Sequence, residues 1–169
     1  MKPPPASVQW WNWVLYPPAE GMRKIRLILE LPAWGKLIFL ETLWYSLYAA
    51  FLLNGQKDYR KVNAVLQKSL PGKERDMLHD AQQELQIVRM VSSAVQTIAK
   101  HTPWRNVCYH QAIQAKLLLH KRGIPCVIRI GFKKNDQGKI EGHAWTKAGD
   151  RIITGFCREE DYSVLKSFE

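Results

Sequence analysis

The pattern of apolar positions changes at Gly123. Before this glycine, apolar residues recur every three or four positions, which predicts helices; after it they alternate with polar residues, which predicts strands. The best-patterned helix covers residues 75–100, where one face carries a repeating apolar set: Leu78, Ala81, Leu85, Val88, Val91, Val95 and Ile98. Helices followed by an antiparallel meander predict an α+β fold.

Three strands are predicted after Gly123. In the first, Cys126, Ile128, Ile130 and Phe132 alternate with their neighbours. A turn-rich loop at residues 133–139 leads to a second strand over 142–147, and a turn at 148–150 leads to a third over 151–156. We expect the C-terminal segment, R-E-E-D-Y-S-V-L-K-S-F, to close the fold with a short helix.

A long apolar helix is predicted over residues 33–53. A membrane span needs about 20 apolar residues without charge, and Glu41 divides this one. We therefore interpret the segment as a core helix, with contact to a membrane surface as the less favoured alternative. Shorter helices are predicted over residues 20–31 and 59–70.

Three regions are expected along the chain. Residues 1–18 contain five of the nine prolines and three of the seven tryptophans, which predicts an extended tail. Residues 19–72 form a helical region, and residues 73–169 form the core. We expect the last two regions to make one compact unit.

Composition narrows the classes of partner and compartment. The net charge of +10 favours acidic partners, but the aromatic residues do not interleave with the basic ones, so no nucleic acid is expected. Three widely separated cysteines without a C-x-x-C pair predict neither a disulfide framework nor a metal site, and no cofactor is implied. The N-terminus lacks the apolar run of a signal peptide, so we expect a cytoplasmic protein.

Residues 102–115, T-P-W-R-N-V-C-Y-H-Q-A-I-Q-A, contain the candidate nucleophile. Asn106 is a good N-cap, which predicts a helix over 107–120 with Cys108 in its first turn. Unpaired N–H groups and the helix dipole favour a thiolate at such a position. A lone helical cysteine is more often a packing residue, and the additional evidence is His143, which lies 35 residues later at the start of a strand.

A cysteine nucleophile needs a base within hydrogen-bond reach and donors for the oxyanion. Cys108 at a helix N-terminus, packed against a sheet that carries His143, would meet both needs, as in the papain and transglutaminase group. The N–H of Cys108 is one candidate oxyanion donor. Gln111, one turn later, is a second, although an ordinary surface glutamine is the alternative.

Several short motifs together resemble one family. They are W-x-x-x-C ending at Cys108, the alanine-rich helix after it, R-G-I-P before a strand, H-A-W at 143–145 before a hairpin, and the apolar A-W-G-K-L-I-F-L-E-T-L-W. In this order they resemble the lasso-peptide leader peptidases, which are transglutaminase-like cysteine proteases. The likeness covers roughly residues 23–156.

This resemblance implies N-terminal helices followed by a transglutaminase/papain-like core, with Cys108 as nucleophile and His143 as base. The expected activity is removal of the leader peptide from a ribosomally made lasso-peptide precursor. The implied partners are that leader, a separate leader-binding protein and an ATP-dependent lasso cyclase. The alternatives are another Cys-dependent acyl transfer, of transglutaminase or amidase type, and a non-catalytic peptide-binding member of the fold.

The chain departs from the family at the residue that orients the histidine. Many members carry Asp about where Gly155 falls, but this chain reads I-I-T-G-F. A two-residue turn at 148–149 would pair Thr154 with His143, which makes Thr154 the expected orienting group; a backbone carbonyl and Asp161 stay open. We expect either Gly155→Asp or Thr154→Asp, but not both, to raise activity.

Overall fold

The computed structural model describes residues 30–54 and 81–168. The tail and the helix predicted over 59–70 lie outside the described residues, as does nearly all of the helix predicted over 20–31. The chain divides into two units, Met1–Leu37 and Ile38–Glu169, and the architecture below is that of the second. The three-region division made from the sequence stays a prediction.

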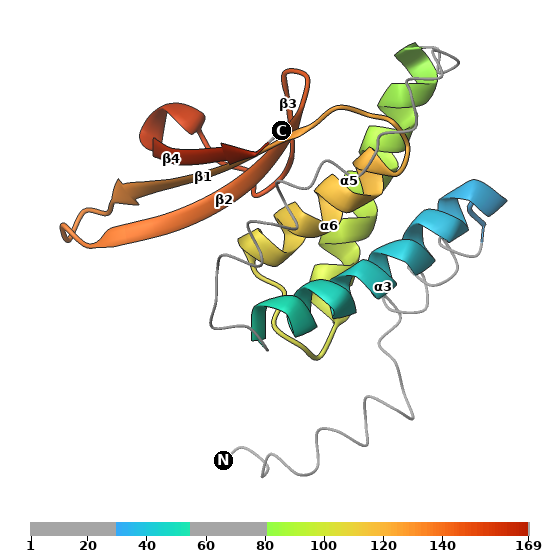
Figure 1. Cartoon of the computed structure of the whole chain (residues 1–169), viewed down its shortest axis with the longest axis horizontal. Coiled ribbons are helices and arrows are strands. Elements are labelled where there is room, and N and C mark those ends of the chain that lie inside the picture. The colour runs from blue at the N-terminus through green and yellow to red at the C-terminus, as the bar shows by residue number, and fades with distance from the viewer. Residues whose placement is uncertain (1–29, 55–80, 169) are drawn as a thin grey trace, which may run out of the picture. The chain divides into compact units, whose positions relative to one another are not determined.

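Within the described residues, α-helices precede a four-stranded antiparallel sheet (Figure 1), so the predicted α+β class is confirmed. The elements are α3 (Ala33–Asn54), α5 (Ala81–His101), α6 (Cys108–His120), β1 (Val127–Lys134), β2 (Ile140–Ala148), β3 (Arg151–Thr154), the 3₁₀ turn η2 (Glu159–Asp161) and β4 (Ser163–Phe168). The strand order across the sheet is β3-β2-β1-β4. The sequence predicted each of these helices and the first three strands.

α6 packs on one face of the sheet, where it contacts β2. The Thr146 hydroxyl of β2 donates a hydrogen bond of 3.3 Å to the Ala112 carbonyl of α6. A core cluster joins α3, α6 and the sheet through side chains from each: Ala49, Leu52, Ala112, Ile113, Ile128, Ala144 and Phe168. The start of α6 is therefore held against β2.

α3 has two apolar faces with different surroundings. Ile38 and Ala49 are buried, so the core interpretation is confirmed for one face. On the other face Leu40, Trp44 and Phe51 are 66%, 68% and 74% exposed. By length and composition alone, α3 qualifies as a membrane span.

The C-terminal segment does not form the predicted helix, and this prediction is wrong. Glu159–Asp161 make a single 3₁₀ turn, and β4 then pairs antiparallel with β1. Phe168 lies opposite Ile128 and is buried in the core. The edge of β1 that does not pair with β2 is available to a further strand, and Phe168 gives that strand an apolar anchor in the core. A short helix would also depend on packing for its stability, so these two features favour a strand.

A carboxylate from α3 binds two cations at the end of α6. Lys121 Nζ lies 2.6 Å from one Glu41 oxygen, and Arg122 donates to the other. Burial alone would raise the pKa of Glu41, but the hydrogen bonds from Lys121 and Arg122 outweigh burial and hold this pKa below its usual value. The Glu41 carboxylate of the apolar helix is therefore tethered to the end of α6.

We expect Glu41→Gln to lower the free energy of unfolding at pH 7 by about 1–2 kcal/mol. Because the folded-state pKa is depressed, this contribution is present above the unfolded pKa and is lost as the pH falls through the folded one. Chemical unfolding of both proteins between pH 7 and pH 3 checks the sign. The two stabilities should converge at the acid end, and a constant difference across the range would refute the role of the charge.

Candidate active site

Cys108 is the first residue of α6. Val107 is the N-cap, with φ −86° and ψ 178°, and the first helical hydrogen bond runs from the Gln111 N–H to the Val107 carbonyl (3.1 Å). The backbone N–H groups of the first helical turn precede this bond, so they do not take part in the i→i−4 hydrogen bonds of the helix. The prediction that Cys108 lies in the first turn is confirmed, and these N–H groups surround its half-buried side chain with partial positive charge.

Asn106 is not the N-cap, so that prediction is wrong by one residue. Its side-chain oxygen instead accepts a hydrogen bond of 2.8 Å from Gln114 Nε2. Its carbonyl accepts one of 3.0 Å from Gln111 Nε2. Gln111 thus lies beside the start of α6 with its amide nitrogen engaged, and its role as an oxyanion donor stays a prediction.

His143 lies on β2 and is oriented by a backbone atom. Its Nε2 is 3.0 Å from the Gly155 carbonyl oxygen. A carbonyl can only accept, so this contact assigns the proton to Nε2 and leaves Nδ1 as the nitrogen that can take a proton. The aromatic rings of Trp145 and Tyr162 lie 6.2 Å and 5.4 Å from the imidazole, centroid to centroid.

The two candidate residues approach the same stretch of β2 from different sides. Cys108 packs against the core cluster that includes Ala144, the residue after His143. Side chains alternate along a strand, so Ala144 and Thr146 face α6 while His143 is on the other face, from which its ring reaches Gly155 beside β2. Within the described chain no hydrogen bond joins the Cys108 sulfur to the imidazole.

Thr154 does not pair with His143, so the predicted register is wrong. Thr154 pairs with Thr146, and Ile153 is an extra residue that makes a bulge in β3. The Thr154 hydroxyl is buried and has no hydrogen-bond partner in the described structure. Of the alternatives left open by the sequence, the backbone carbonyl, that of Gly155, contacts the imidazole.

The backbone conformation and the close surroundings of Gly155 explain why the chain has glycine, and not Asp, at this position. Its φ is +66°, and a Cβ there would collide with the Ala144 carbonyl oxygen and lie 3.0 Å from the Trp145 Cα. An L-residue is therefore disfavoured both by backbone conformation and by space. Because Gly155 lies so close to β2, its carbonyl oxygen reaches His143.

His110 is the other histidine close to Cys108 in sequence. It is 4% exposed, and burial, with a further contribution from Arg105, lowers the pKa of its imidazole. Two positions along an α-helix are rotated by about 200°, so His110 and Cys108 are on opposite sides of α6. This geometry excludes His110 as a rival base.

A family model agrees with this arrangement. The model of the transglutaminase-like superfamily matches residues 47–167, which is more than half of the chain. The chain belongs to the transglutaminase-like superfamily. Neither a curated protein nor a solved structure gives a significant match.

The transglutaminase-like match begins inside α3 and ends inside β4, so it includes α5, α6 and the four strands. The predicted fold, with Cys108 at a helix N-terminus packed on a small antiparallel sheet that carries His143, is confirmed. The catalytic roles of Cys108 and His143 stay predictions. Among residues 30–54 and 81–168, no group of three His, Cys, Asp or Glu side chains could hold a metal ion.

Sequence reasoning missed one polar residue of this transglutaminase-like core. Glu159 binds Trp145, Lys147 and Arg129 on the sheet face that carries His143. In the sequence it is one of three consecutive acids, with nothing to distinguish it from Glu160 or Asp161. The Trp145 side chain that Glu159 binds is fully buried.

The three cysteines of the transglutaminase-like core should differ in reactivity. Burial raises the pKa of Cys126 to about 11. Burial, and then the charge of Glu159, raises the pKa of Cys157. We expect iodoacetamide at pH 7.5 to alkylate Cys108 first, which peptide mapping by mass spectrometry will measure. Faster labelling of Cys126 in the folded protein would contradict this order.

Proposed function

We propose that this protein is a cysteine peptidase that removes the leader peptide from a ribosomally made lasso-peptide precursor. The observation that supports it most is the position of Cys108, at the N-terminus of α6 and against the strand that carries His143. The transglutaminase-like family and the resemblance of the W-x-x-x-C and H-A-W motifs support the same conclusion.

The proposed reaction has two steps. Nδ1 of His143 takes the thiol proton, and the Cys108 sulfur attacks the carbonyl carbon of the scissile peptide bond. The backbone N–H of Cys108 itself, at the start of α6, donates to the oxyanion. The imidazolium returns its proton to the leaving amine of the core peptide, and water then hydrolyses the leader thioester.

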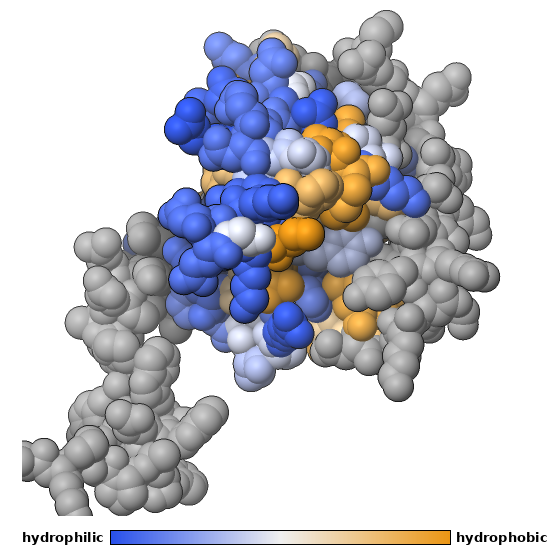
Figure 2. Space-filling model, turned by 90° about the vertical axis from the view of Figure 1, so that its left-hand side faces the viewer, coloured by the Kyte–Doolittle hydropathy of each residue, from blue (hydrophilic) through white to orange (hydrophobic). Residues whose placement is uncertain are grey.

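An extended peptide fits the open side of β2. β3 pairs only with residues 146–148 of β2, so Ile140–His143 lack a strand neighbour on that side among the described residues. Unpaired N–H and C=O groups of an edge can bind a peptide as an added strand. Figure 2, which faces the side of the molecule at the left of Figure 1, shows apolar surface between hydrophilic regions.

The proposed partners are the precursor leader, a separate leader-binding protein and an ATP-dependent lasso cyclase. The net charge of +10 supports an acidic partner among them. A cytoplasmic location, without a cofactor and without nucleic acid, belongs to the same proposal. Contact of α3 with a membrane surface is the less favoured part.

One observation favours a second candidate, a peptide-binding member of the fold without catalysis. The Cys108 sulfur and the His143 imidazole are on different faces of β2 and are not hydrogen-bonded in the described structure, and a catalytic pair must reach about 3 Å. Catalytic hydrogen bonds often tighten only when substrate binds, so the peptidase stays the first candidate.

Co-expression with the precursor peptide encoded beside this gene tests the proposal. Mass spectrometry should find a core peptide that has lost its leader, and a Cys108→Ala strain should contain only intact precursor. Intact precursor in both strains, with the protein folded and the precursor bound, would establish the non-catalytic candidate. Modified glutamine or amide groups on an uncut precursor would establish a different acyl transfer.

A further inference from the structure

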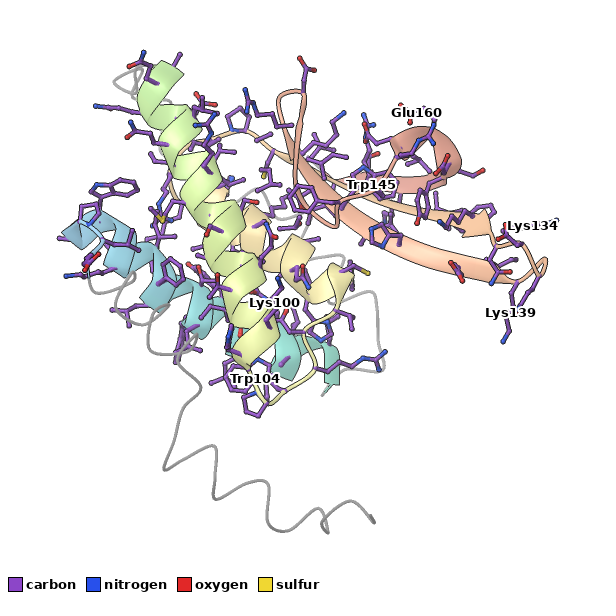
Figure 3. The ribbon with its side chains drawn as sticks, turned by 180° about the vertical axis from the view of Figure 1, so that it is seen from behind. Lys100, Trp104, Lys134, Lys139, Trp145 and Glu160 are labelled. Atoms are coloured by element: carbon purple, nitrogen blue, oxygen red, sulfur yellow. The ribbon has the colours of Figure 1, made fainter. Side chains whose placement is uncertain are left out.

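The sheet face opposite α6 carries His143 together with polar side chains that have no part in the proposed reaction. Because β side chains alternate, Arg129 and Gly131 of β1 share this face with His143, Trp145 and Lys147 of β2. The η2 turn lies beside this face, and Figure 3 labels Trp145 on the strand and Glu160 on the turn. We call this the outer face.

The Glu159 carboxylate accepts three hydrogen bonds on the outer face. Oε1 accepts from Trp145 Nε1 (2.6 Å) and from Arg129 Nη1 (3.0 Å), and Oε2 accepts from Lys147 Nζ (2.6 Å). The hydrogen bond from Lys147, together with that from Trp145 and the nearby charges, lowers the pKa of Glu159, against a smaller effect of burial. Glu159 is thus ionised at neutral pH, and charge-assisted bonds of this kind are the stronger ones.

The Trp145 indole is fixed at both of its ends. Its N–H is bound by Glu159. Its six-membered ring lies over Gly131, where a Cβ would be only 3.1 Å and 3.2 Å from the ring carbons Cη2 and Cζ3. Trp145 is fully buried, so neither contact competes with water.

His143 is paired with Gly131 in the register of β1 and β2, so its ring projects beside this fixed indole. The imidazole and the indole are 6.2 Å apart and nearly parallel, at 21°. Tyr162 lies 5.4 Å from the imidazole and 5.6 Å from the indole, so three rings form one cluster. The cluster limits the rotamers in which Nε2 can reach the Gly155 carbonyl.

We propose that Glu159 is a positioning residue for His143, and that it acts through the indole of Trp145. Its carboxylate holds Trp145, the indole holds the imidazole, and Nε2 then meets the Gly155 carbonyl, which leaves Nδ1 as the nitrogen that can take a proton. The inference rests on the proposed function, because it gives His143 the role of base. The carboxylate of Glu159 would thus orient His143 through Trp145, without contacting the imidazole itself.

A purely structural role is the competing explanation, since Glu159 also ties η2 to the sheet. Glu41 provides the matched control, because its carboxylate likewise binds two cations but lies at the far end of α6 from Cys108. Both residues should contribute to stability. Only Glu159 should control the orientation of the His143 imidazole.

The test uses the full chain without substrate. Nitrogen-15 NMR of the histidine rings, with His143→Ala for assignment, reports the fraction of His143 protonated at Nε2 in the neutral form. A second readout is the iodoacetamide rate at Cys108 at pH 7.5. Lys133, Glu141, Lys147 and Arg129 carry the other charges of the outer face, so all variants are compared at one pH and one salt concentration.

Glu159→Ala and Trp145→Phe should each reduce the Nε2-protonated fraction and lower the Cys108 rate about tenfold. Glu159→Gln keeps an acceptor for the indole N–H and should restore most of the wild-type signal. Glu41→Gln should lose thermal stability with both readouts unchanged.

A wild-type His143 signal in folded Glu159→Ala or Trp145→Phe would overturn the proposal. If Glu159→Ala fails to fold, Trp145→Phe decides alone, because it removes only the donor that Glu159 binds and keeps a ring. A changed His143 signal with an unchanged Cys108 rate would leave the positioning intact and contradict the proposed Cys–His pair instead.

Discussion

Cys108→Ala and His143→Ala should each abolish leader cleavage, by roughly a thousandfold or more. The two residues act as one unit in the proposed reaction, because the sulfur needs the imidazole to lose its proton and the leaving amine needs the same proton. The double variant should therefore be no slower than either single variant. Cleavage of the co-expressed precursor, followed by mass spectrometry over time, measures all three.

The control for these variants is Cys126→Ser, since Cys126 is buried and burial raises the pKa of its thiol to about 11. It should leave cleavage unchanged at a temperature at which the protein is folded. Full turnover by Cys108→Ala would end the peptidase proposal. A double variant much slower than both single variants would mean that the two residues act independently.

Gly155→Ala should lower the free energy of unfolding by about 3–4 kcal/mol and also displace the group that orients His143. Its φ of +66° disfavours any L-residue, and the new Cβ would meet the Ala144 carbonyl. Moving the chain away from Ala144 would carry the Gly155 carbonyl away from the imidazole. Thermal or chemical unfolding, with the NMR signal of His143, checks both effects.

Gly149→Ala is the matched control for this substitution. Gly149 has φ +53°, but no atom lies within 4 Å of the place that its Cβ would take, so the cost should be the backbone strain alone, about 1 kcal/mol. The His143 signal should not change. Equal losses for the two glycines would show that the close approach at Gly155 is unimportant.

The same geometry revises the expectation that a restored carboxylate raises activity. Gly155→Asp meets the same obstruction as Gly155→Ala. Thr154→Asp would place the carboxylate opposite Thr146 rather than His143. The structure therefore argues against a gain from either substitution.

The helices and the first three strands were predictable because their signals are local. The period of the apolar residues located α5, and Gly123, with φ +68°, ends α6 where the sequence indicated. Pairing between strands is not local, so the sequence did not reveal the bulge at Ile153 or the pairing of β4 with β1. A single inserted residue was enough to move Thr154 away from His143.

The candidate site was predictable only as far as side chains define it. Cys108 at a helix start and His143 on a strand have recognisable sequence contexts. The group that contacts the imidazole is the Gly155 carbonyl, and a backbone carbonyl leaves no residue type to recognise. Glu159 was missed for a different reason, because its partners come from β1 and β2 and only the folded sheet brings them together.

The most direct test of the peptidase proposal is a covalent probe of Cys108. A synthetic leader peptide whose C-terminal carbonyl is replaced by a vinyl sulfone should alkylate the wild-type protein, and peptide mapping should place the adduct on Cys108 alone. His143→Ala should react far more slowly, and Cys108→Ala should not react. An adduct on Cys126 or Cys157, or no adduct from a protein that still cleaves its precursor, would contradict the assignment of Cys108 as the nucleophile.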